Sequence, residues 1–226
     1  MAYPTVSKPY GLQPINLIGG QVYAGSTRLF RIASGYATSI YYGDVVKLNS
    51  DGTVVKDTGT TTATPVGIFL GCTYTNPSTK QKLNYQFYAG GTAADDIQAY
   101  IVDDPDVLFK VAAVSTGTTV AFYSSEQIGL NAALVQNNGS NTTGDSQVAI
   151  LGTSFATTAS LPIRVVDIVP DTSNSSNGYC EFICKFNAPY VVSTATSTLN
   201  TSTNVVTTTV TSTVTGGHQY LNPVGV

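Results

Sequence analysis

The sequence predicts an all-β fold, a sandwich or barrel of short antiparallel strands. Short apolar runs are separated by turn signals at regular intervals, among them Asp51-Gly52, Asn138-Gly139 and Thr143-Gly144. Hardly any segment repeats its apolar residues at the period of a helix. With 226 residues, 42% of them hydrophobic, the chain is long enough to bury the core of one large β domain or two small ones.

Residues 1–35 are predicted to form an extended N-terminal arm and a first strand. Pro4, Pro9 and Pro14 each favour extended geometry in the residue that precedes them. Several glycines interrupt any helix in this segment. Because an extended arm cannot bury itself, we expect it either to lie on its own domain or to reach a neighbouring molecule.

Residues 36–190 are predicted to form the β domain, which opens with a hairpin. Residues 41–48 and 54–55 read as its two strands, with alternating faces. Asp51-Gly52 between them supplies the positive φ angles that a tight hairpin turn needs. The Thr-rich segment 57–65 that follows is predicted to be an exposed loop.

Residues 66–72 are almost wholly apolar, which predicts a strand covered on both faces. Gly67 and Gly71 lie in this strand, where a bare backbone allows another segment to approach closely. Farther along, Ser124 and Gln127 form a possible capping box for a short helix that Gly129 limits. The turn Asn177-Gly178 leads into the last strand of the domain. The further strands are predicted at 83–88, 97–102, 107–114, 147–151, 163–169 and 179–186.

Residues 191–226 form a C-terminal segment rich in Thr, Ser, Val and Asn. Its β-branched residues favour extended structure, but it has no core of its own. One prediction is a hairpin on the domain edge that turns around residues 200–204. A second is a segment added to the sheet of a neighbouring subunit. Low sequence complexity leaves disorder as a third alternative.

Charged residues make up 10% of the chain, far below the roughly 25% of ordinary soluble domains. Ser, Thr, Asn and Gln fill the polar positions instead, and such a surface loses little when it is desolvated. This composition suits a protein whose faces are covered by other subunits, although a plain soluble β protein with a Thr-rich surface has it too.

The balance and placement of charge exclude some partners. The formal net charge is −3, and the ten Lys and Arg residues are scattered along the sequence. Nucleic-acid-binding proteins usually present a basic patch, so we expect no direct contact with DNA or RNA.

No stretch approaches the roughly 18 apolar residues of a membrane helix, so no membrane partner is predicted. The N-terminus lacks the apolar run of a signal peptide, which predicts synthesis in a cytoplasm.

The three cysteines are predicted to be buried, unpaired thiols. Cys180 and Cys184 share one face of a predicted strand and lie about 13 Å apart at roughly 3.3 Å per residue. A disulfide needs Cα atoms within about 7 Å, so these two are not expected to pair. Cys72 lies in the predicted strand 66–72. We therefore expect all three cysteines to act as small, buried hydrophobic residues.

Five carboxylates between residues 95 and 106 suggest a calcium site, because calcium takes oxygen ligands from closely spaced acidic residues. The calcium-loop spacing of an EF-hand is absent, and Asp before Pro is also an ordinary turn initiator. The sequence therefore predicts no metal site, with calcium kept as an alternative. The carboxylates are Asp95, Asp96, Asp103, Asp104 and Asp106.

No catalytic set is predicted. The nucleophile elbow, the phosphate loop and the dinucleotide fingerprint are all absent. His218 is the single histidine, and its position beside Gly216-Gly217 is expected to be a mobile place for a catalytic base. The chain has no Trp, so we expect no aromatic platform for a sugar. We therefore predict a non-enzyme without catalytic, cofactor-binding or metal-binding residues.

Three groups of motifs, taken in order, carry a family resemblance. They are Tyr42 to Leu48 (Tyr-Gly-Asp-Val-Val-Lys-Leu) followed by Val66-Gly67-Ile68, then Asp103 to Val111, then Gly144-Asp145-Ser146 with Leu161 to Val166. Together they resemble virion structural proteins of tailed bacteriophages, especially head cement (decoration) proteins of marine and cyanobacterial phages. The resemblance covers roughly residues 1–190. Its motifs are scaffold positions, so it transfers no functional residues.

The resemblance implies a structural protein on the capsid exterior, often a homotrimer, that is made in the host cytoplasm. Such a protein locks neighbouring capsomers of the major capsid protein against the pressure of packaged DNA. The low charge and the 14 Tyr residues agree with extensive protein contacts. Three other classes stay open: a fibre or tail adhesin, the major shell protein itself, and, more distantly, a polysaccharide-cleaving enzyme.

Overall fold

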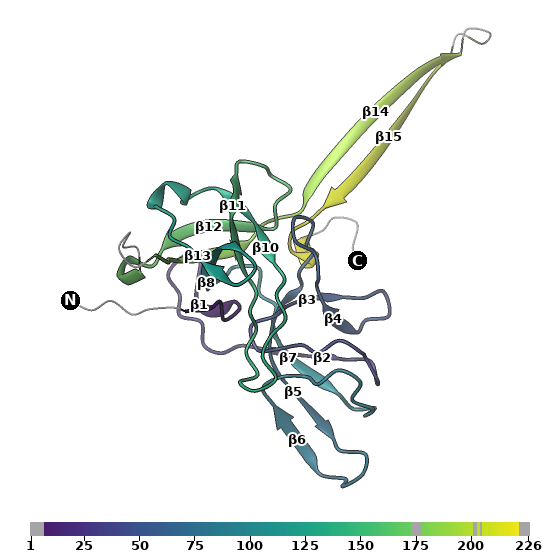
Figure 1. The fold of residues 1–226 in the computed structure, drawn as a ribbon. Coiled ribbons are helices and arrows are strands. Elements are labelled where there is room, and N and C mark those ends of the chain that lie inside the picture. The colour runs from purple at the N-terminus through teal and green to yellow at the C-terminus, as the bar shows by residue number, and fades with distance from the viewer. Residues whose placement is uncertain (1–6, 173–177, 201–202, 204, 222–226) are drawn as a thin grey trace.

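The computed structural model describes residues 7–172, 178–200, 203 and 205–221. The fold in these residues is all-β, as predicted, and its only helical segments are short 3₁₀ turns. The strands form three sheets: a small barrel, a second sheet packed beside it and a two-stranded ribbon (Figure 1).

The first sheet closes into a small barrel. β8 pairs with β11, β11 with β10, β10 with β12, β12 with β13, and β13 returns to β8. Closure leaves no open sheet edge on this ring, and β1 and β9 also pair with β8. The β8–β11 pairing is parallel, whereas the other pairings of this sheet are antiparallel. The strands are β1 (Gln13–Leu17), β8 (Val107–Thr116), β9 (Thr119–Val120), β10 (Asn131–Val135), β11 (Ala149–Ala156), β12 (Ile163–Ile168) and β13 (Glu181–Phe186).

Three phenylalanines pack among many aliphatic side chains in the hydrophobic cluster of the barrel. Phe109, Phe182 and Phe186 are buried, and the ring centroids of Phe109 and Phe186 lie 5.0 Å apart. The sequence patterns missed strand β10, whose residues Asn131–Val135 include two alanines and one asparagine. β10 pairs with strands on both sides, so burial and pairing outweigh its weak intrinsic preference for extended structure.

The second sheet is antiparallel and contains the predicted hairpin and the apolar strand after it. Its order is β2-β7-β5-β3-β4, with β6 also paired to β5. The predicted strand boundaries agree with the observed ones to within a few residues. The strands are β2 (Arg28–Arg31), β3 (Val45–Leu48), β4 (Val54–Lys56), β5 (Gly67–Thr75), β6 (Lys82–Tyr85) and β7 (Gln98–Val102).

Strand β5 is covered on both faces, as its composition predicted. Ile68 packs into the cluster of the barrel, and Phe69 packs into a second cluster on the opposite face of the sheet. A Cβ atom on Gly67 would lie 2.1 Å from the carbonyl oxygen of Val102, and one on Gly71 would lie 2.9 Å from a carbonyl oxygen of β6. Both glycines are therefore sites of close backbone approach, each to a different strand.

The described part of the N-terminal segment lies on its own domain. β1 belongs to the barrel and β2 to the second sheet. Between the sheets, the amide of Gly11 donates to the carbonyl of Val148 at 3.2 Å and the amide of Leu12 donates to that of Gly43 at 3.0 Å. The extended segment thus joins the two sheets. Residues 1–6 lie outside the described residues.

The structure differs from two local predictions. The segment 57–65 was expected to be an exposed loop, but Asp57 and Ala63 are buried in it. The Asp57 carboxylate accepts hydrogen bonds from the amides of Gly59 and Thr64, which folds the loop back on itself. The predicted short helix is a 3₁₀ turn at Ser125–Gln127. The predicted turn at Asn177-Gly178 falls partly outside the described residues.

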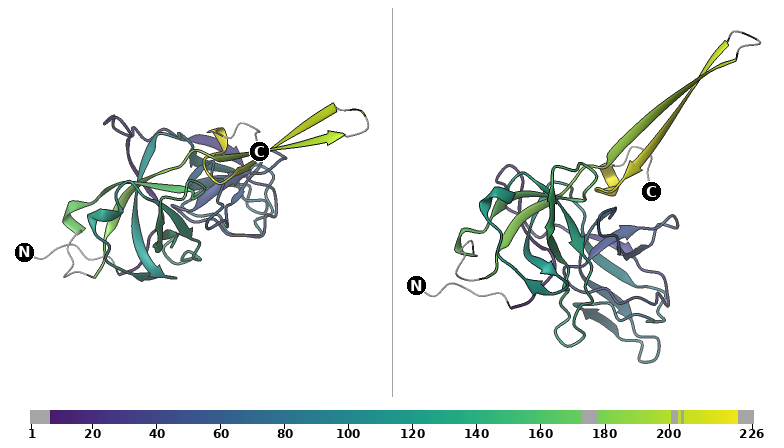
Figure 2. Two further views of the ribbon diagram at one scale, coloured as in Figure 1. Left: turned by 90° about the horizontal axis from the view of Figure 1, so that it is seen from above. Right: turned by 45° about the horizontal axis from the view of Figure 1, so that its top comes forward.

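The C-terminal segment forms a two-stranded ribbon, so a hairpin is present as one alternative predicted, but it does not lie on the edge of the domain as that alternative had it. β14 (Tyr190–Asn200) pairs with β15 (Val205–Thr215) in one uninterrupted antiparallel register. The ribbon projects away from the body in all three views of Figures 1 and 2. Neither of its strands pairs with the other two sheets.

Candidate interaction surface

The register of the ribbon gives it two faces of different composition. Residues directly opposite each other share a face, and successive pairs alternate between faces. The face that we call the Val face takes the pairs Val191–Val214, Ser193–Ser212, Ala195–Val210, Ser197–Thr208 and Leu199–Val206. The opposite face, the Thr face, takes the pairs Tyr190–Thr215, Val192–Thr213, Thr194–Thr211, Thr196–Thr209, Thr198–Thr207 and Asn200–Val205.

The Val face presents apolar side chains to solvent. Val206 is 60% exposed and Val210 is 63% exposed. Between their positions, the hydroxyl oxygens of Ser197 and Thr208 lie 3.0 Å apart and form a hydrogen bond. A two-stranded ribbon without a packing partner is marginally stable in water. The Val face is therefore a surface that would gain stability from being covered.

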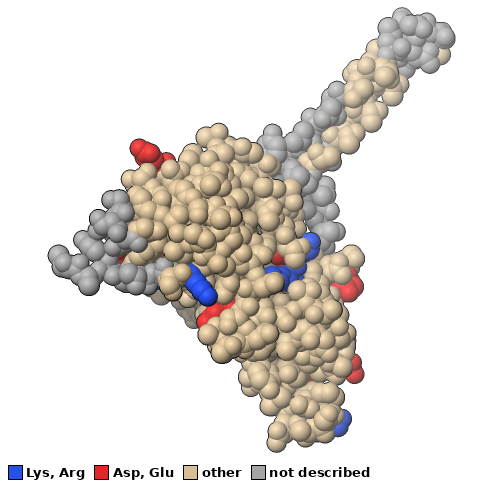
Figure 3. Space-filling model, viewed as in Figure 1, with Lys and Arg blue, Asp and Glu red and all other residues tan. Residues whose placement is uncertain are grey.

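Charge is absent from the ribbon. Residues 187–226 contain no Asp, Glu, Lys or Arg. The described part of the ribbon is accordingly free of red and blue in Figure 3. Proteins usually protect an exposed sheet edge with charges, prolines or bulges, because unpaired backbone groups there add strands from other chains. This ribbon is continuous in register and carries none of these protections along its two strands.

Residues 216–221, which we call the root, fix the base of the ribbon on the body. Gly217 has a φ of 78°, and a Cβ atom there would lie 2.5 Å from the nitrogen of Pro189. The amide of Gln219 donates to the carbonyl of Pro65 at 2.8 Å. Its side chain accepts from the amide of Leu48 at 2.6 Å and donates to the Leu48 carbonyl at 3.1 Å. The root is thus tied to the second sheet.

His218 lies in the root and is fully buried, so the expectation of a mobile histidine is wrong. Its ring lies 6.1 Å from that of Phe186 and 5.4 Å from that of Tyr220. Nδ1 accepts from the Tyr220 amide at 3.3 Å, and Nε2 has no hydrogen-bond partner among the described residues. Burial lowers the pKa of His218 to about 4, because the charged imidazolium loses its hydration. The side chain is a neutral packing element.

An ion pair supports the root from the second sheet. Arg28 on β2 pairs with Asp103, and the hydroxyl of Tyr220 donates to the same carboxylate at 3.0 Å. The guanidinium also lies 5.1 Å from the centroid of the Tyr220 ring. Burial, together with the neighbouring Asp103, raises the pKa of Tyr220 to about 12.

Four of the five aspartates of the calcium hypothesis engage different partners: Asp103 engages Arg28 and Tyr220 as described above, and the other three engage residues elsewhere. Asp96 accepts from the amide and hydroxyl of Thr75, Asp104 accepts from the amide of Asp106, and Asp106 lies 3.7 Å from Lys185. Across the residues that the structure describes, no three His, Cys, Asp or Glu side chains gather closely enough to hold a metal ion. The arrangement gives calcium no common site.

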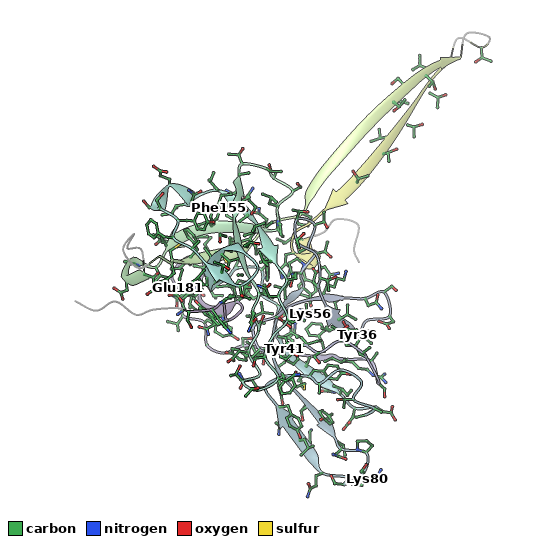
Figure 4. The ribbon with its side chains drawn as sticks, in the orientation of Figure 1. Tyr36, Tyr41, Lys56, Lys80, Phe155 and Glu181 are labelled. Carbon is green, nitrogen blue, oxygen red and sulfur yellow. The ribbon has the colours of Figure 1, made fainter. Side chains whose placement is uncertain are left out.

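A buried ion pair that the sequence patterns missed joins the two sheets. The ammonium of Lys56 lies 2.8 Å from Oδ2 of Asp44, which also accepts from the Tyr41 amide at 2.9 Å. Oδ1 accepts from the hydroxyl of Ser146 at 2.5 Å. Figure 4 shows Tyr41 and Lys56 next to each other in the middle of the body. Every charged atom here has a partner within the protein, so the group acts as a structural clamp. Its only sequence signal was an aspartate inside an apolar strand pattern.

A cavity of about 590 Å³ lies between the 57–65 loop and β10. Thr58, Thr60 and Thr116 contribute hydroxyl groups to it, and Leu134 contributes apolar surface. The amide nitrogen of Gln136 donates to the Gly59 carbonyl at 2.9 Å. The one charged side chain in the lining is Lys56, which the clamp engages. The cavity therefore offers neutral polar groups but no free acid, base or thiol.

The three cysteines are buried and form no disulfide, as predicted. Burial raises the pKa of the Cys72 thiol to about 12 and that of Cys180 to about 11. Thiols held in this state are poor nucleophiles. The interior cysteines therefore serve as small hydrophobic side chains.

Within the described part of the chain, no helix has the length and apolar content needed to cross a membrane. Comparisons of the sequence with protein-family models and with curated proteins, and of the fold with solved structures, return no match.

Proposed function

We propose that this chain is a structural virion protein that binds the outside of a tailed-phage capsid and cements neighbouring capsomers of the major capsid protein. The observation that carries the proposal is the ribbon: a charge-free hairpin in continuous register that stands clear of a packed body (Figure 1). The family resemblance supports it independently, because its motifs lie in the two sheets of the body and not in the ribbon.

The ribbon supplies the reach that such a role requires. Each strand has 11 residues. At about 3.3 Å per residue, the ribbon extends about 36 Å from its root, which is comparable to the diameter of a small domain. The hydrogen bonds and close glycine packing of the root hold the base of the ribbon on the body, so contacts along the ribbon transmit force to the second sheet. Cementing is then mechanical: separating two capsomers would require the contacts of the ribbon and the body to be exposed to water.

The composition of the surface suits large interfaces. Uncharged Thr, Ser and Asn side chains are cheaper to desolvate than charged ones. The net charge of −3 favours the outside of the shell over the inside, where packaged DNA concentrates negative charge. We accordingly propose that the protein binds the capsid exterior after synthesis in the host cytoplasm. The family resemblance further suggests a homotrimer, and we propose no contact with nucleic acid or membrane.

The interior favours a binding protein over an enzyme. The buried carboxylate of Asp44 is neutralised by Lys56, the histidine is neutral and enclosed, and the thiols are buried. The one charged side chain that lines the pocket beside β10, Lys56, is held by Asp44. We therefore propose that the chain catalyses no reaction.

Co-sedimentation with phage shells tests this function. Purified shells that lack the protein should bind it until a fixed ratio to the major capsid protein is reached. A variant in which residues 190–215 are replaced by a short Gly-Ser turn should bind far more weakly, whereas its body should keep the same melting temperature.

The main alternative is a fibre or tail adhesin, for which the exposed Thr face is a suitable surface. An adhesin would bind host cells, and it would leave shells unbound. Binding to cells with no binding to shells would therefore contradict the proposed function and favour the adhesin.

A further inference from the structure

We infer that the cavity between the 57–65 loop and β10 is a binding site for a neutral sugar. Its volume of about 590 Å³ lies within the range of about 300–1,000 Å³ that is usual for small-molecule sites. Lys56, which is labelled in Figure 4, lines the cavity and marks its place between the second sheet and the barrel. Sugar binding goes beyond the cementing role and does not depend on it.

The lining offers hydrogen-bonding groups without a free charge. Thr58, Thr60 and Thr116 contribute hydroxyl groups, and none of the described residues that line the cavity is an aspartate or a glutamate. The ammonium of Lys56 is held 2.8 Å from the Asp44 carboxylate. An anionic ligand would therefore find no free cation here, and a metal ion would find no carboxylate. Threonine hydroxyls both donate and accept, so a ligand with neutral hydroxyl groups is complementary to them.

Polar and apolar groups of the cavity lie in different places. Thr58, Thr60 and Thr116 are exposed, so their hydroxyl groups lie at the mouth. Ala133 and Leu134 are buried and supply an apolar interior. A sugar ring has a matching division, because its hydroxyl groups lie around its edge and its C–H groups lie on its faces. The ring would cover the apolar surface while its hydroxyl groups bond to the mouth.

The loop that forms one wall is fixed before any ligand binds. The Asp57 carboxylate accepts from the amides of Gly59 and Thr64 at 2.9 and 2.8 Å. The amide of Leu134 on β10 donates to the Thr60 carbonyl at 3.1 Å. A wall that is already held in place costs little conformational entropy when a ligand binds.

Gln136 supplies an acceptor that the protein leaves unused. Its Nε2 atom donates to the Gly59 carbonyl at 2.9 Å, which orients the side-chain amide. Its Oε1 atom is buried and has no hydrogen-bond partner among the described residues. A buried acceptor without a partner is unfavourable, and a hydroxyl group that donated to it would remove this cost. Because Gln136 lines the cavity, a sugar hydroxyl there is a suitable donor.

An extended peptide fits the cavity less well than a sugar does. Such a peptide gains most of its affinity by adding a strand to a free sheet edge. β11 pairs with β10 along one edge. On the other side, the amide of Leu134 is already bonded to the carbonyl of Thr60. Neither edge of β10 is open to a further strand at this point.

The affinity should be modest, because none of the described lining residues is aromatic and no ring can stack on the sugar. We expect a dissociation constant in the millimolar range. Repetition of the site on a shell, which rests on the proposed function, would raise the avidity for a surface covered with such sugars.

Saturation-transfer NMR on the free chain tests the inference with glucose, galactose, mannose and N-acetylglucosamine as probes. The first three differ in the orientation of single hydroxyl groups, so the set samples several hydrogen-bond arrangements. At least one probe should bind with a millimolar dissociation constant, whereas gluconate, which carries a carboxylate, should not bind. The absence of binding by all four sugars at tens of millimolar, or equal binding of gluconate, would overturn the inference.

A pair of variants locates the bound sugar. T60V/T116V removes two hydroxyl groups from the mouth and should weaken binding about tenfold. Both residues are exposed, valine keeps their branched shape, and the Thr60 carbonyl that holds Leu134 remains, so the melting temperature should not change. The matched variant T207V/T209V, on the exposed Thr face of the ribbon, should bind as the wild type does. Wild-type affinity in T60V/T116V would place the sugar elsewhere and refute the assignment of this cavity.

The outcome is independent of the cementing experiment, because the free chain is used without shells. A chain that binds a sugar but not shells would contradict the proposed function and leave the sugar site standing. A chain that binds shells but none of the sugars would have the opposite meaning.

Discussion

Acid should weaken the fold through His218, and the effect can be isolated. Burial lowers the pKa of this histidine to about 4, against 6.5 when the side chain is solvated. Between these two values the unfolded chain binds a proton that the folded chain does not, so acid favours unfolding. The stability that the neutral ring provides is complete above pH 6.5, and it falls as the pH drops from 6.5 towards 4.

The expected magnitude follows from the two pKa values. Each unit of difference corresponds to about 1.4 kcal/mol, so the free energy of unfolding should fall by about 3 kcal/mol between pH 7 and pH 4 from this residue alone. The groups that face the ring are Asp103 and Asp104, which favour its charged form, together with Arg28 and Tyr220 around the Asp103 carboxylate. These groups remain in a His218 variant, so the difference between the two proteins reports the histidine.

Urea denaturation at a series of pH values provides the assay. His218→Phe keeps an aromatic ring beside Phe186 and removes the titration. The variant should lose less stability than the wild type between pH 7 and pH 4, by about 3 kcal/mol. Equal pH dependence in the two proteins would refute the buried, neutral histidine and with it the rigid root.

Three further predictions concern the stability of two variants and the accessibility of the cysteines. Asp44→Ala should destabilise the fold by about 3–5 kcal/mol in urea denaturation, because it leaves Lys56 buried without a counter-ion; a change below about 1 kcal/mol would mean that water reaches the clamp. Gly67→Ala should sharply reduce soluble yield and melting temperature, since its Cβ would lie 2.1 Å from the Val102 oxygen, and an unchanged melting temperature would contradict this close approach. Native protein should resist iodoacetamide at pH 8 and react at all three cysteines in denaturant; rapid native labelling would disprove their burial.

The local elements of the second sheet could be predicted because their signals are short in range. The hairpin of β3 and β4 follows from Asp51-Gly52 between two apolar runs, and β5 follows from its continuous apolar composition. The hairpin of the ribbon was one of three alternatives, and the β-branched residues on both sides of a polar segment favoured it. In each case the pattern is short, and the longest, Tyr190 to Thr215, spans 26 residues, so the partner strand is near in the sequence.

The features that were missed depend on partners that are distant in the sequence. Closure of the barrel joins β8 to β13, and the weakly patterned β10 becomes a strand only because β11 and β12 flank it. The clamp joins Asp44 to Ser146, 102 residues apart. His218 resembled part of a mobile tail because its neighbours are glycines, yet those glycines permit the close packing that buries it.

The heat stability of phage capsids tests the cementing role most directly. Capsids that lack this protein are filled with DNA, mixed with the wild-type chain or the ribbon-deleted chain, and heated while DNA release is followed by dye fluorescence. We predict that the wild-type chain raises the release temperature until it saturates the shell and that the ribbon-deleted chain does so weakly or not at all. A release temperature that the wild-type chain leaves unchanged at saturating concentration would contradict the cementing function.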